Sequence, residues 1–221
     1  MAVENQTLAQ FYGNQRNPFN YAKVEQINRD ITTGWLTLDE ITEQLNLYQD
    51  ESQDTYLTSL ELATRMAIED YLGTPISSTT YRVYYGNPGL YNTQLYLDLP
   101  EVSVGLNGAN NVSINSVKYY ADGSNNTTTT LPSTEYYYDQ SGNRVVINAI
   151  PQTLSQTAAN PIFVEYVLSP SFISQYPVIK QAGLLLLTHL YNNRSNTTDG
   201  VLHDIPFGIA TLLRPYKPLV M

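Results

Sequence analysis

The first helical pattern of hydrophobic residues begins just after Trp35, in the segment 36–45. Its apolar positions recur at the spacing of one helix face. Thr37 can cap this helix, and Glu40, three residues later, can complete a capping box. The apolar positions are Leu38, Ile41 and Leu45. A short helix is therefore predicted.

A longer helix is predicted from about 52 to 72, after which Gly73 and Pro75 supply stop signals. The stripe expected to face the core comprises Leu57, Leu60, Ala63, Ala67, Ile68 and Tyr71. From residue 39 to residue 70, nine acidic residues stand against one basic residue, Arg65. The acidic residues are Asp39, Glu40, Glu43, Asp50, Glu51, Asp54, Glu61, Glu69 and Asp70. We therefore expect this pair of helices to be strongly electronegative.

From about Thr79 the hydrophobic period changes to two, which is typical of strands with one buried face. The predicted strands are 80–85, 94–99, 112–120, 135–139, 144–147 and 162–168, and a short one is expected earlier at 21–27. Turn sequences such as Asp122-Gly123 separate neighbouring strands, which favours antiparallel pairing. The middle of the chain is predicted to form a small antiparallel sheet domain.

The helical period returns after Pro177, a residue favoured in the first turn of a helix. The positions expected to face the core are Val178, Ala182, Leu185, Leu186 and His189. A last short helix, with Ile209, Leu212 and Leu213, should end at Pro215.

These elements predict an α+β fold, a small bundle of about four helices with an inserted antiparallel β-sheet domain. The expected parts are an N-terminal arm that can include one strand (1–34), a first helical half (35–78), the β domain (79–170), a second helical half (171–213) and a C-terminal tail (214–221).

Composition narrows the range of functions. Hydrophobic residues make up 42% of the chain, enough for a core, whereas charged residues make up 14% and there are 19 tyrosines but one tryptophan. A net charge of −9 opposes ordinary binding to nucleic-acid phosphates, and the lack of cysteine excludes disulfides and thiolate chemistry. The N-terminus lacks a signal-peptide pattern, and the apolar run 182–187 is far shorter than the roughly twenty residues that span a bilayer. We expect neither secretion nor a membrane association.

No catalytic or cofactor-binding motif stands out. The Walker and G-x-G-x-x-G patterns are absent. His189 lies on an apolar helical stripe and is interpreted as structural, while His203 beside Asp204 has no G-x-S-x-G nucleophile to serve. Adjacent carboxylates such as Glu69 and Asp70 diverge on a helix and are interpreted as a solvated face. We therefore expect no enzyme activity, no cofactor and no metal site.

Several short motifs follow one another between residues 35 and 216. They are WLTLDEI at 35–41, IEDYLGTP at 68–75, PVIKQA at 177–182, YNNR at 191–194, IPFG at 205–208 and LLRPY at 212–216. In this order, around an inserted sheet, they resemble the head-tail connector (adaptor) proteins of tailed double-stranded-DNA bacteriophages, in the larger variant of that family. The first 34 residues and the Asn/Thr-rich turns of the sheet depart from the pattern.

The resemblance implies a structural virion protein in the neck between capsid and tail, assembled in the cytoplasm of a bacterial host. Identical subunits, roughly twelve to match the portal protein, would form a ring beneath it. The ring would extend the DNA channel, let double-stranded DNA pass without specific binding, and offer a surface to the tail or the next head-completion protein. The segment expected to dock on the portal comprises Leu213, Arg214, Pro215, Tyr216, Lys217, Pro218, Leu219, Val220 and Met221.

Acidic helices that face such a channel would repel the phosphates of passing DNA. The residues predicted to line it are Asp50, Glu51, Asp54 and Glu61. The alternative is that these carboxylates only keep the outer surface soluble.

Three other functions stay open at this point. A ligand-binding module would use the Tyr-rich sheet to hold a carbohydrate or a host-surface ligand. A DNA-packaging subunit that grips DNA would need a basic face, but the last 45 residues, 177–221, carry a net charge of only +2. An enzyme would need a mutually supporting catalytic set, which the sequence does not offer.

Overall fold

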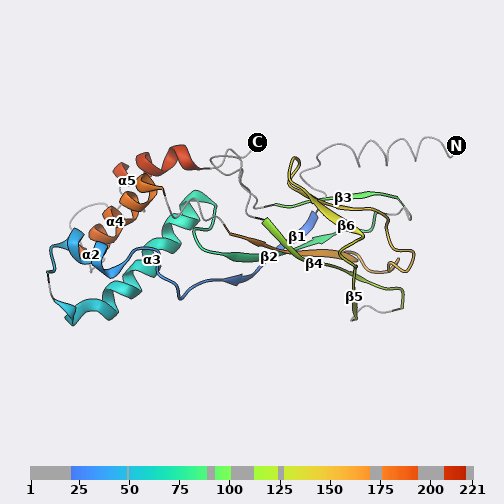
Figure 1. Cartoon of the computed structure of the whole chain (residues 1–221), viewed down its shortest axis with the longest axis horizontal. Coiled ribbons are helices and arrows are strands. Elements are labelled where there is room, and N and C mark those ends of the chain that lie inside the picture. The colour runs from blue at the N-terminus through green and yellow to red at the C-terminus, as the bar shows by residue number, and fades with distance from the viewer. Residues whose placement is uncertain are drawn as a thin grey trace. The chain divides into compact units, whose positions relative to one another are not determined.

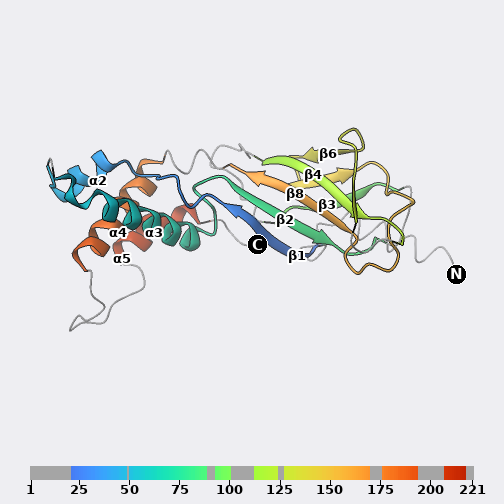
Figure 2. The same ribbon diagram turned by 90° about the horizontal axis from the view of Figure 1, so that it is seen from below.

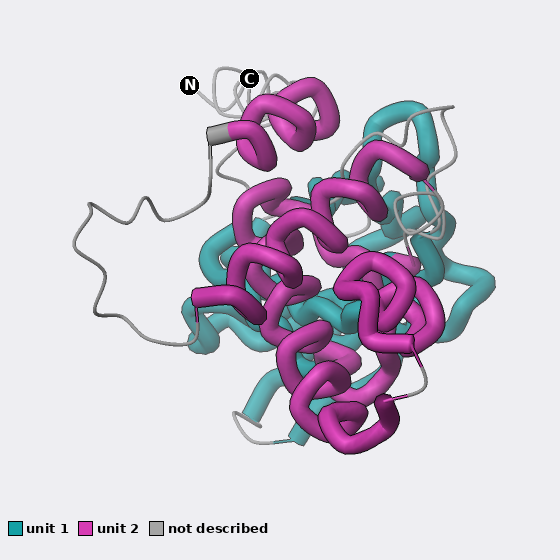
Figure 3. The backbone as a smooth tube through the Cα atoms, turned by 90° about the vertical axis from the view of Figure 1, so that its left-hand side faces the viewer, with its two compact units in different colours: residues 1–28, 79–102, 112–168 teal, residues 29–78, 103–111, 169–221 magenta. Residues whose placement is uncertain are grey.

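The computed structural model describes residues 21–48, 50–88, 93–100, 112–123, 127–169, 176–193 and 207–217. These residues form helices and antiparallel sheets (Figure 1). The chain divides into two compact units, coloured separately in Figure 3. We call them the β unit (residues 1–28, 79–102 and 112–168) and the helical unit (residues 29–78, 103–111 and 169–221). The predicted α+β fold, in which the chain makes strands between two sets of helices, is confirmed.

The described strands are β1 (Tyr21–Arg29), β2 (Thr79–Tyr85), β3 (Leu95–Asp98), β4 (Val112–Tyr120), β5 (Thr128–Thr130), β6 (Tyr136–Asp139), β7 (Arg144–Ile147) and β8 (Ile162–Leu168). Strands β1, β2, β8, β4 and β5 form one sheet in that order, and β3, β7 and β6 form another (Figure 2). The sequence predicted these strands to within two residues, except β5, a run of threonines without hydrophobic alternation.

Alternation along the strands gives the two sheets one shared hydrophobic core. In β2, Tyr81, Val83 and Tyr85 are buried, whereas the residues between them are only partly buried. Antiparallel pairing sets Tyr81 opposite Tyr166 of β8, and their rings stack with centroids 5.7 Å apart. The smaller sheet contributes Leu97, Val145 and Ile147 to the same core. The side chains at the remaining positions of β2 lie on the opposite face, which we call the outer face of the five-stranded sheet.

The helical unit contains α2 (Leu38–Leu45), the 3-10 turn η1 (Glu51–Gln53), α3 (Asp54–Leu72), α4 (Pro177–Asn192), α5 (Phe207–Leu213) and the 3-10 turn η3 (Arg214–Tyr216). The predicted capping box of α2 is present, because the Glu40 amide donates to Thr37 Oγ1 at 3.3 Å and the Thr37 amide donates to Glu40 Oε2 at 3.0 Å. At the end of α3, Gly73 takes the left-handed conformation, with φ of 66°. Helices α3, α4 and α5 share one apolar cluster, which includes Ile68, Leu72, Ile179, Leu186 and Leu213.

The predicted buried stripe of α3 is partly wrong. Ala63 is exposed and Leu60 only partly buried, whereas Glu61, Arg65 and Glu69 are buried. In α4, Leu185 is likewise exposed, and Ile179 and Leu187 are buried instead. Both helices are apolar enough on several sides that their hydrophobic pattern alone does not fix their rotation.

Within the described residues, no helix is both long and apolar enough to cross a membrane.

Candidate interaction surfaces

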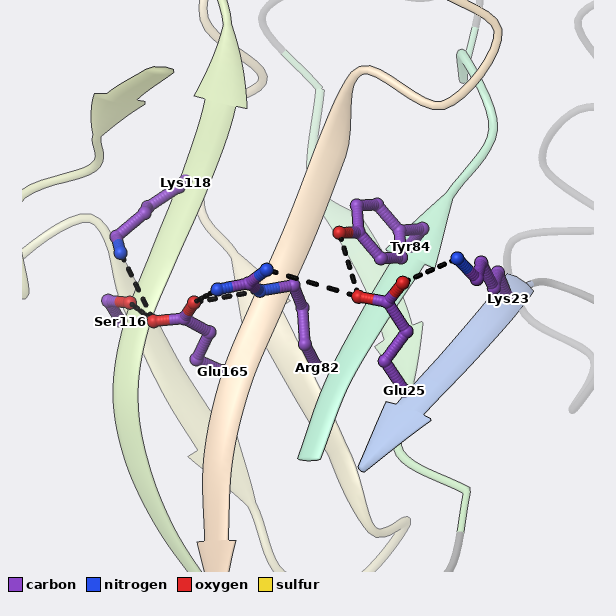
Figure 4. A network of polar contacts seen from close by, with 7 residues as sticks. All are labelled: Lys23, Glu25, Arg82, Tyr84, Ser116, Lys118 and Glu165. Atoms are coloured by element: carbon purple, nitrogen blue, oxygen red, sulfur yellow. Dashed lines mark hydrogen bonds and ion pairs between the residues drawn. The ribbon is translucent and has the colours of Figure 1, made fainter. Parts of the chain in front are cut away.

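A network of charged side chains covers the outer face of the five-stranded sheet (Figure 4). Glu165 of β8 lies at its centre. Its Oε1 accepts from Arg82 Nε at 2.8 Å, and its Oε2 accepts from Ser116 Oγ and Lys118 Nζ, both at 3.1 Å. On β1, Glu25 pairs with Lys23 and accepts from the Tyr84 hydroxyl at 3.0 Å.

The cations of this network also cover an aromatic ring. The Arg82 guanidinium lies 5.4 Å and Lys118 Nζ 6.0 Å from the centroid of Phe163, whose exposure is 5%. Burial opposes ionisation of Glu165, but hydrogen bonds from Arg82, Lys118 and Ser116 outweigh it and lower its pKa. The three cations Lys23, Arg82 and Lys118 share two carboxylates, Glu25 and Glu165. The network therefore offers little unpaired positive charge to DNA phosphates.

Several tyrosine hydroxyls of the β unit form hydrogen bonds within the subunit. Tyr85 donates to the Asp98 carbonyl at 2.7 Å, Tyr138 donates to Asn143 Oδ1 at 3.0 Å, and Tyr119 lies 3.2 Å from Thr153 Oγ1. Among the described tyrosines of this unit, Tyr137 alone falls in the exposed class, at 50%. The strands therefore gather no exposed cluster of tyrosine rings in the described residues, so nothing there favours the carbohydrate-binding alternative.

A column of buried charges runs along α3, where Glu61, Arg65 and Glu69 follow at intervals of four residues. Arg65 is fully buried and donates to Ser77 Oγ at 2.7 Å and to the backbone carbonyls of Asp30 and Thr33. These contacts hold two segments against α3: the one that follows β1 and the one that precedes β2.

Glu69 strengthens the same attachment. Its Oε1 accepts from the amides of Ile76 at 2.8 Å and Ser77 at 3.2 Å, and its Oε2 accepts from Arg29 Nε at 2.9 Å. Glu69 is 4% exposed, so the interpretation of this carboxylate as part of a solvated face is wrong. Hydrogen-bond donors from residues distant in sequence compensate its burial. The sequence shows that these three charged residues share one helix face, but it does not show that this face is buried.

Glu61 needs a correction as a channel-lining candidate. Its exposure is 2%, and its Oε1 accepts from the amides of Trp35 at 2.6 Å and Leu36 at 3.1 Å. This carboxylate anchors the approach to α2 and does not face solvent in the subunit.

The other acidic candidates lie together where α3 begins. Asp50 and Glu51 are exposed and Asp54 is half-buried. Asp50 caps η1 by accepting from the Ser52 amide at 3.0 Å, and its hydrogen bonds with Ser52 lower its pKa. Negative charge is also favoured at the N-terminal end of a helix by the helix dipole. The carboxylates thus stabilise the start of α3 and leave an acidic surface there.

In the described part of the predicted docking segment, some residues pack within the helical unit and others are exposed. Leu213 is fully buried in the core shared by α3, α4 and α5. Tyr216 packs on Tyr176 with ring centroids 5.5 Å apart, and Lys217 Nζ lies 5.0 Å from the centroid of Tyr71. Arg214 and Pro215 are exposed. Pro218, Leu219, Val220 and Met221 lie outside the described residues.

The structure describes the surroundings of one of the two histidines. His189 is partly buried rather than buried, and Asn193 Nδ2 lies 3.3 Å from its Nδ1. His203 and Asp204 lie outside the described residues. Across the described ranges, no group of three or more candidate ligands could hold a metal ion.

No family model matches the sequence, and no curated protein matches it either. Solved structures do share its fold. A chain in the neck of an empty gene transfer agent particle computed with C6 symmetry matches with a TM-score of 0.57 at 16% identity. A chain in the virion of a native gene transfer agent particle matches with 0.54 at 18%, and one in the neck of a native particle computed with C12 symmetry matches with 0.50 at 15%. Each match covers 90% of this chain and 97% of the other.

Proposed function

We propose that this chain is a structural subunit of the neck of a bacteriophage-like particle, a head-tail connector that forms a ring beneath the portal. The supporting observation is a shared fold that covers 90% of this chain and 97% of each neck or virion chain. Coverage on this scale means that the helical unit and the β unit recur together in those particles. A common α+β module alone would match only part of either chain.

The ring is proposed to hold twelve copies, in keeping with the sixfold and twelvefold symmetry of two of the matched necks. In a cyclic ring, each subunit offers two different surfaces to its two neighbours. The portal would sit above, and the tail or a further head-completion protein below. Assembly would take place in the host cytoplasm before the ring becomes part of the virion.

Double-stranded DNA is proposed to pass through the ring without being held. Asp50, Glu51 and Asp54 are the lining candidates, because they are the acidic candidates that retain exposure at the start of α3. These carboxylates would repel the DNA phosphates, so the duplex would not bind to the channel wall as it passes. Glu61 is left out because its carboxylate is buried.

The portal contact is proposed to involve Arg214, Pro215 and the segment 218–221. Leu213 and Tyr216 are left out because they pack within the helical unit. The exposed Arg214 can meet a carboxylate on the portal, and the apolar end of the sequence can enter a groove there.

Sedimentation velocity of the protein, its cognate portal and their mixture tests the proposal. A mixed species that contains about one subunit of this chain per portal subunit supports a ring on the portal. The absence of any mixed species across salt and pH contradicts the connector function. In that case, binding of the β unit to a glycan panel would support the carbohydrate-binding alternative.

A further inference from the structure

In the part of the chain that the structure describes, the five-stranded sheet ends in β1 on one side and β5 on the other, and β1 is the longer strand. This strand spans nine residues, none of its side chains is buried, and Ile27 is 43% exposed. Among the residues that the structure describes, β1 has β2 on one side and no strand on the other. The amide and carbonyl groups along that outer side can therefore receive a further strand.

Strand β5 forms the opposite margin. It consists of Thr128–Thr130, all exposed, and it pairs with Lys118–Tyr120 at the end of β4. Threonine is a strong strand former, and this margin carries no charge that would repel an incoming strand.

Proteins commonly protect an open strand edge with charged side chains or by making the strand short. The charges of β1 are engaged elsewhere. Lys23 and Glu25 pair with each other on the outer face (Figure 4), and Arg29 binds Glu69 of α3. The margins of the smaller sheet, β3 and β6, are only four residues long each. β1 is therefore the long and weakly protected edge of the β unit.

We infer that β1 of one subunit pairs with β5 of the next, so that the five-stranded sheets join around the ring. The inference rests on the proposed function, because a closed ring of identical subunits needs two different surfaces that fit each other. The two margins of one sheet meet that condition, since backbone donors and acceptors on any two strands are complementary. Pairing of β1 with a second β1 would instead close as a dimer.

A pairing limited by the three residues of β5 is weak. Rings are therefore expected on the portal, where neighbours are held together, and not in the free protein at low concentration.

Cysteine cross-linking tests this contact cleanly, because the chain has no cysteine of its own. Each of Ala22→Cys, Gln26→Cys and Asn28→Cys is combined with Thr129→Cys, so that the unknown register is covered. The two margins of one sheet lie roughly 19 Å apart, four strand spacings of about 4.8 Å, beyond the reach of a disulfide. Any disulfide between them must therefore join two subunits.

On the portal, oxidation of at least one double variant should give a ladder of covalent multimers, whereas each single variant should stay unlinked. Portal-bound rings that show no ladder with any pair would overturn the strand pairing and leave the proposed function standing. Dimers from the single β1 variants would also overturn it, in favour of β1 pairing with itself. Failure of the unmodified protein to form rings on the portal would count against the proposed function itself.

A second test does not depend on the register between β1 and β5. Ile27→Lys adds a charge to the open edge and should abolish rings while leaving the thermal unfolding of the free subunit unchanged. Tyr137→Lys, a matched change at an exposed residue of the other sheet, should leave rings intact. Rings that survive Ile27→Lys would contradict the inference.

Discussion

The indole ring of Trp35 lies directly against the backbone of Gly183. A Cβ atom built on Gly183 would lie 2.7 Å from Cζ3 and 2.9 Å from Cη2 of that ring. Helix α4 can therefore approach the segment before α2 only because residue 183 has no side chain. The Trp35 amide is bound at the same time by Glu61 of α3, so this residue connects two helices.

Gly183→Ala should destabilise the helical unit by about 1–3 kcal/mol, because the added methyl group has no space. Thermal unfolding followed by the fluorescence of Trp35, the single tryptophan, measures the effect. The matched control is Gly208→Ala in α5, where a Cβ would meet nothing within 4 Å. That variant should be neutral or stabilising by up to about 1 kcal/mol, since alanine is the better helix former. Equal effects of the two variants would contradict the packing described.

Glu69→Ala should cost about 3–5 kcal/mol, because it leaves Arg29 and the amides of Ile76 and Ser77 without their buried acceptor. Urea unfolding gives the free energy. The control is the neighbouring Asp70→Ala, which removes a side chain that is 74% exposed and should change stability by less than about 0.5 kcal/mol. A small effect at Glu69 would show that the buried column does not hold the segments around β1 and β2.

Local signals in the sequence were sufficient for most elements. The Thr37 and Glu40 box identified the start of α2, and alternation identified the strands other than β5, because both signals depend on neighbouring residues. The burial of Arg65 was not predictable in the same way. Charged residues are normally exposed, and its partners at Asp30 and Thr33 are identified only by the folded chain.

The candidate surfaces were also only partly predictable from the sequence. Asp50 could be recognised from its place before a helix, because capping is local. The outer-face network could not, since it depends on β8 lying between β2 and β4. The sequence contains no local signal for which strands become neighbours. Leu213 was assigned to docking because the resemblance to the connector family implies a docking segment from residue 213 onward, but its burial depends on contacts with α3 and α4.

Acid should destabilise the protein. Hydrogen bonds from the backbone and side chains of Thr33 and Thr32 lower the pKa of Asp30, and those from Ser141 and Arg144 lower that of Asp139. A carboxyl whose pKa is lower in the folded state stabilises it above the unfolded pKa of about 4 and loses this contribution as the pH falls further. The free energy of unfolding should therefore decrease from pH 5 to pH 3, and less steeply in Asp30→Asn. Constant or increasing stability over this interval would contradict the assignment.

Truncation should separate folding from docking. Removal of residues 218–221 should leave the thermal unfolding temperature unchanged and abolish binding to the portal. Leu213→Ala, in contrast, should lower stability by about 2–5 kcal/mol, because it opens a cavity in the core of α3, α4 and α5. Circular dichroism and cosedimentation with the portal distinguish the two effects. Full portal binding by the truncated chain would place the docking surface elsewhere.

Neutralising the acidic surface should make the ring retain DNA. The triple change Asp50→Asn, Glu51→Gln and Asp54→Asn keeps the side-chain shapes and the cap on η1 but removes three charges per subunit. Portal-bound rings of this variant should bind double-stranded DNA more tightly than the unmodified ring, and the difference should shrink at high salt. The control is Asp39→Asn with Glu43→Gln on α2, both exposed and outside the proposed lining. Equal DNA retention by both variants would assign the carboxylates to solubility alone.

Electron microscopy of the protein mixed with its cognate portal shows whether this chain forms a ring there. A head-tail connector should appear as a ring coaxial with the portal, with subunit density that fits both the helical unit and the β unit. Portals that carry no additional ring, at protein concentrations well above those of the cell, would contradict the connector function.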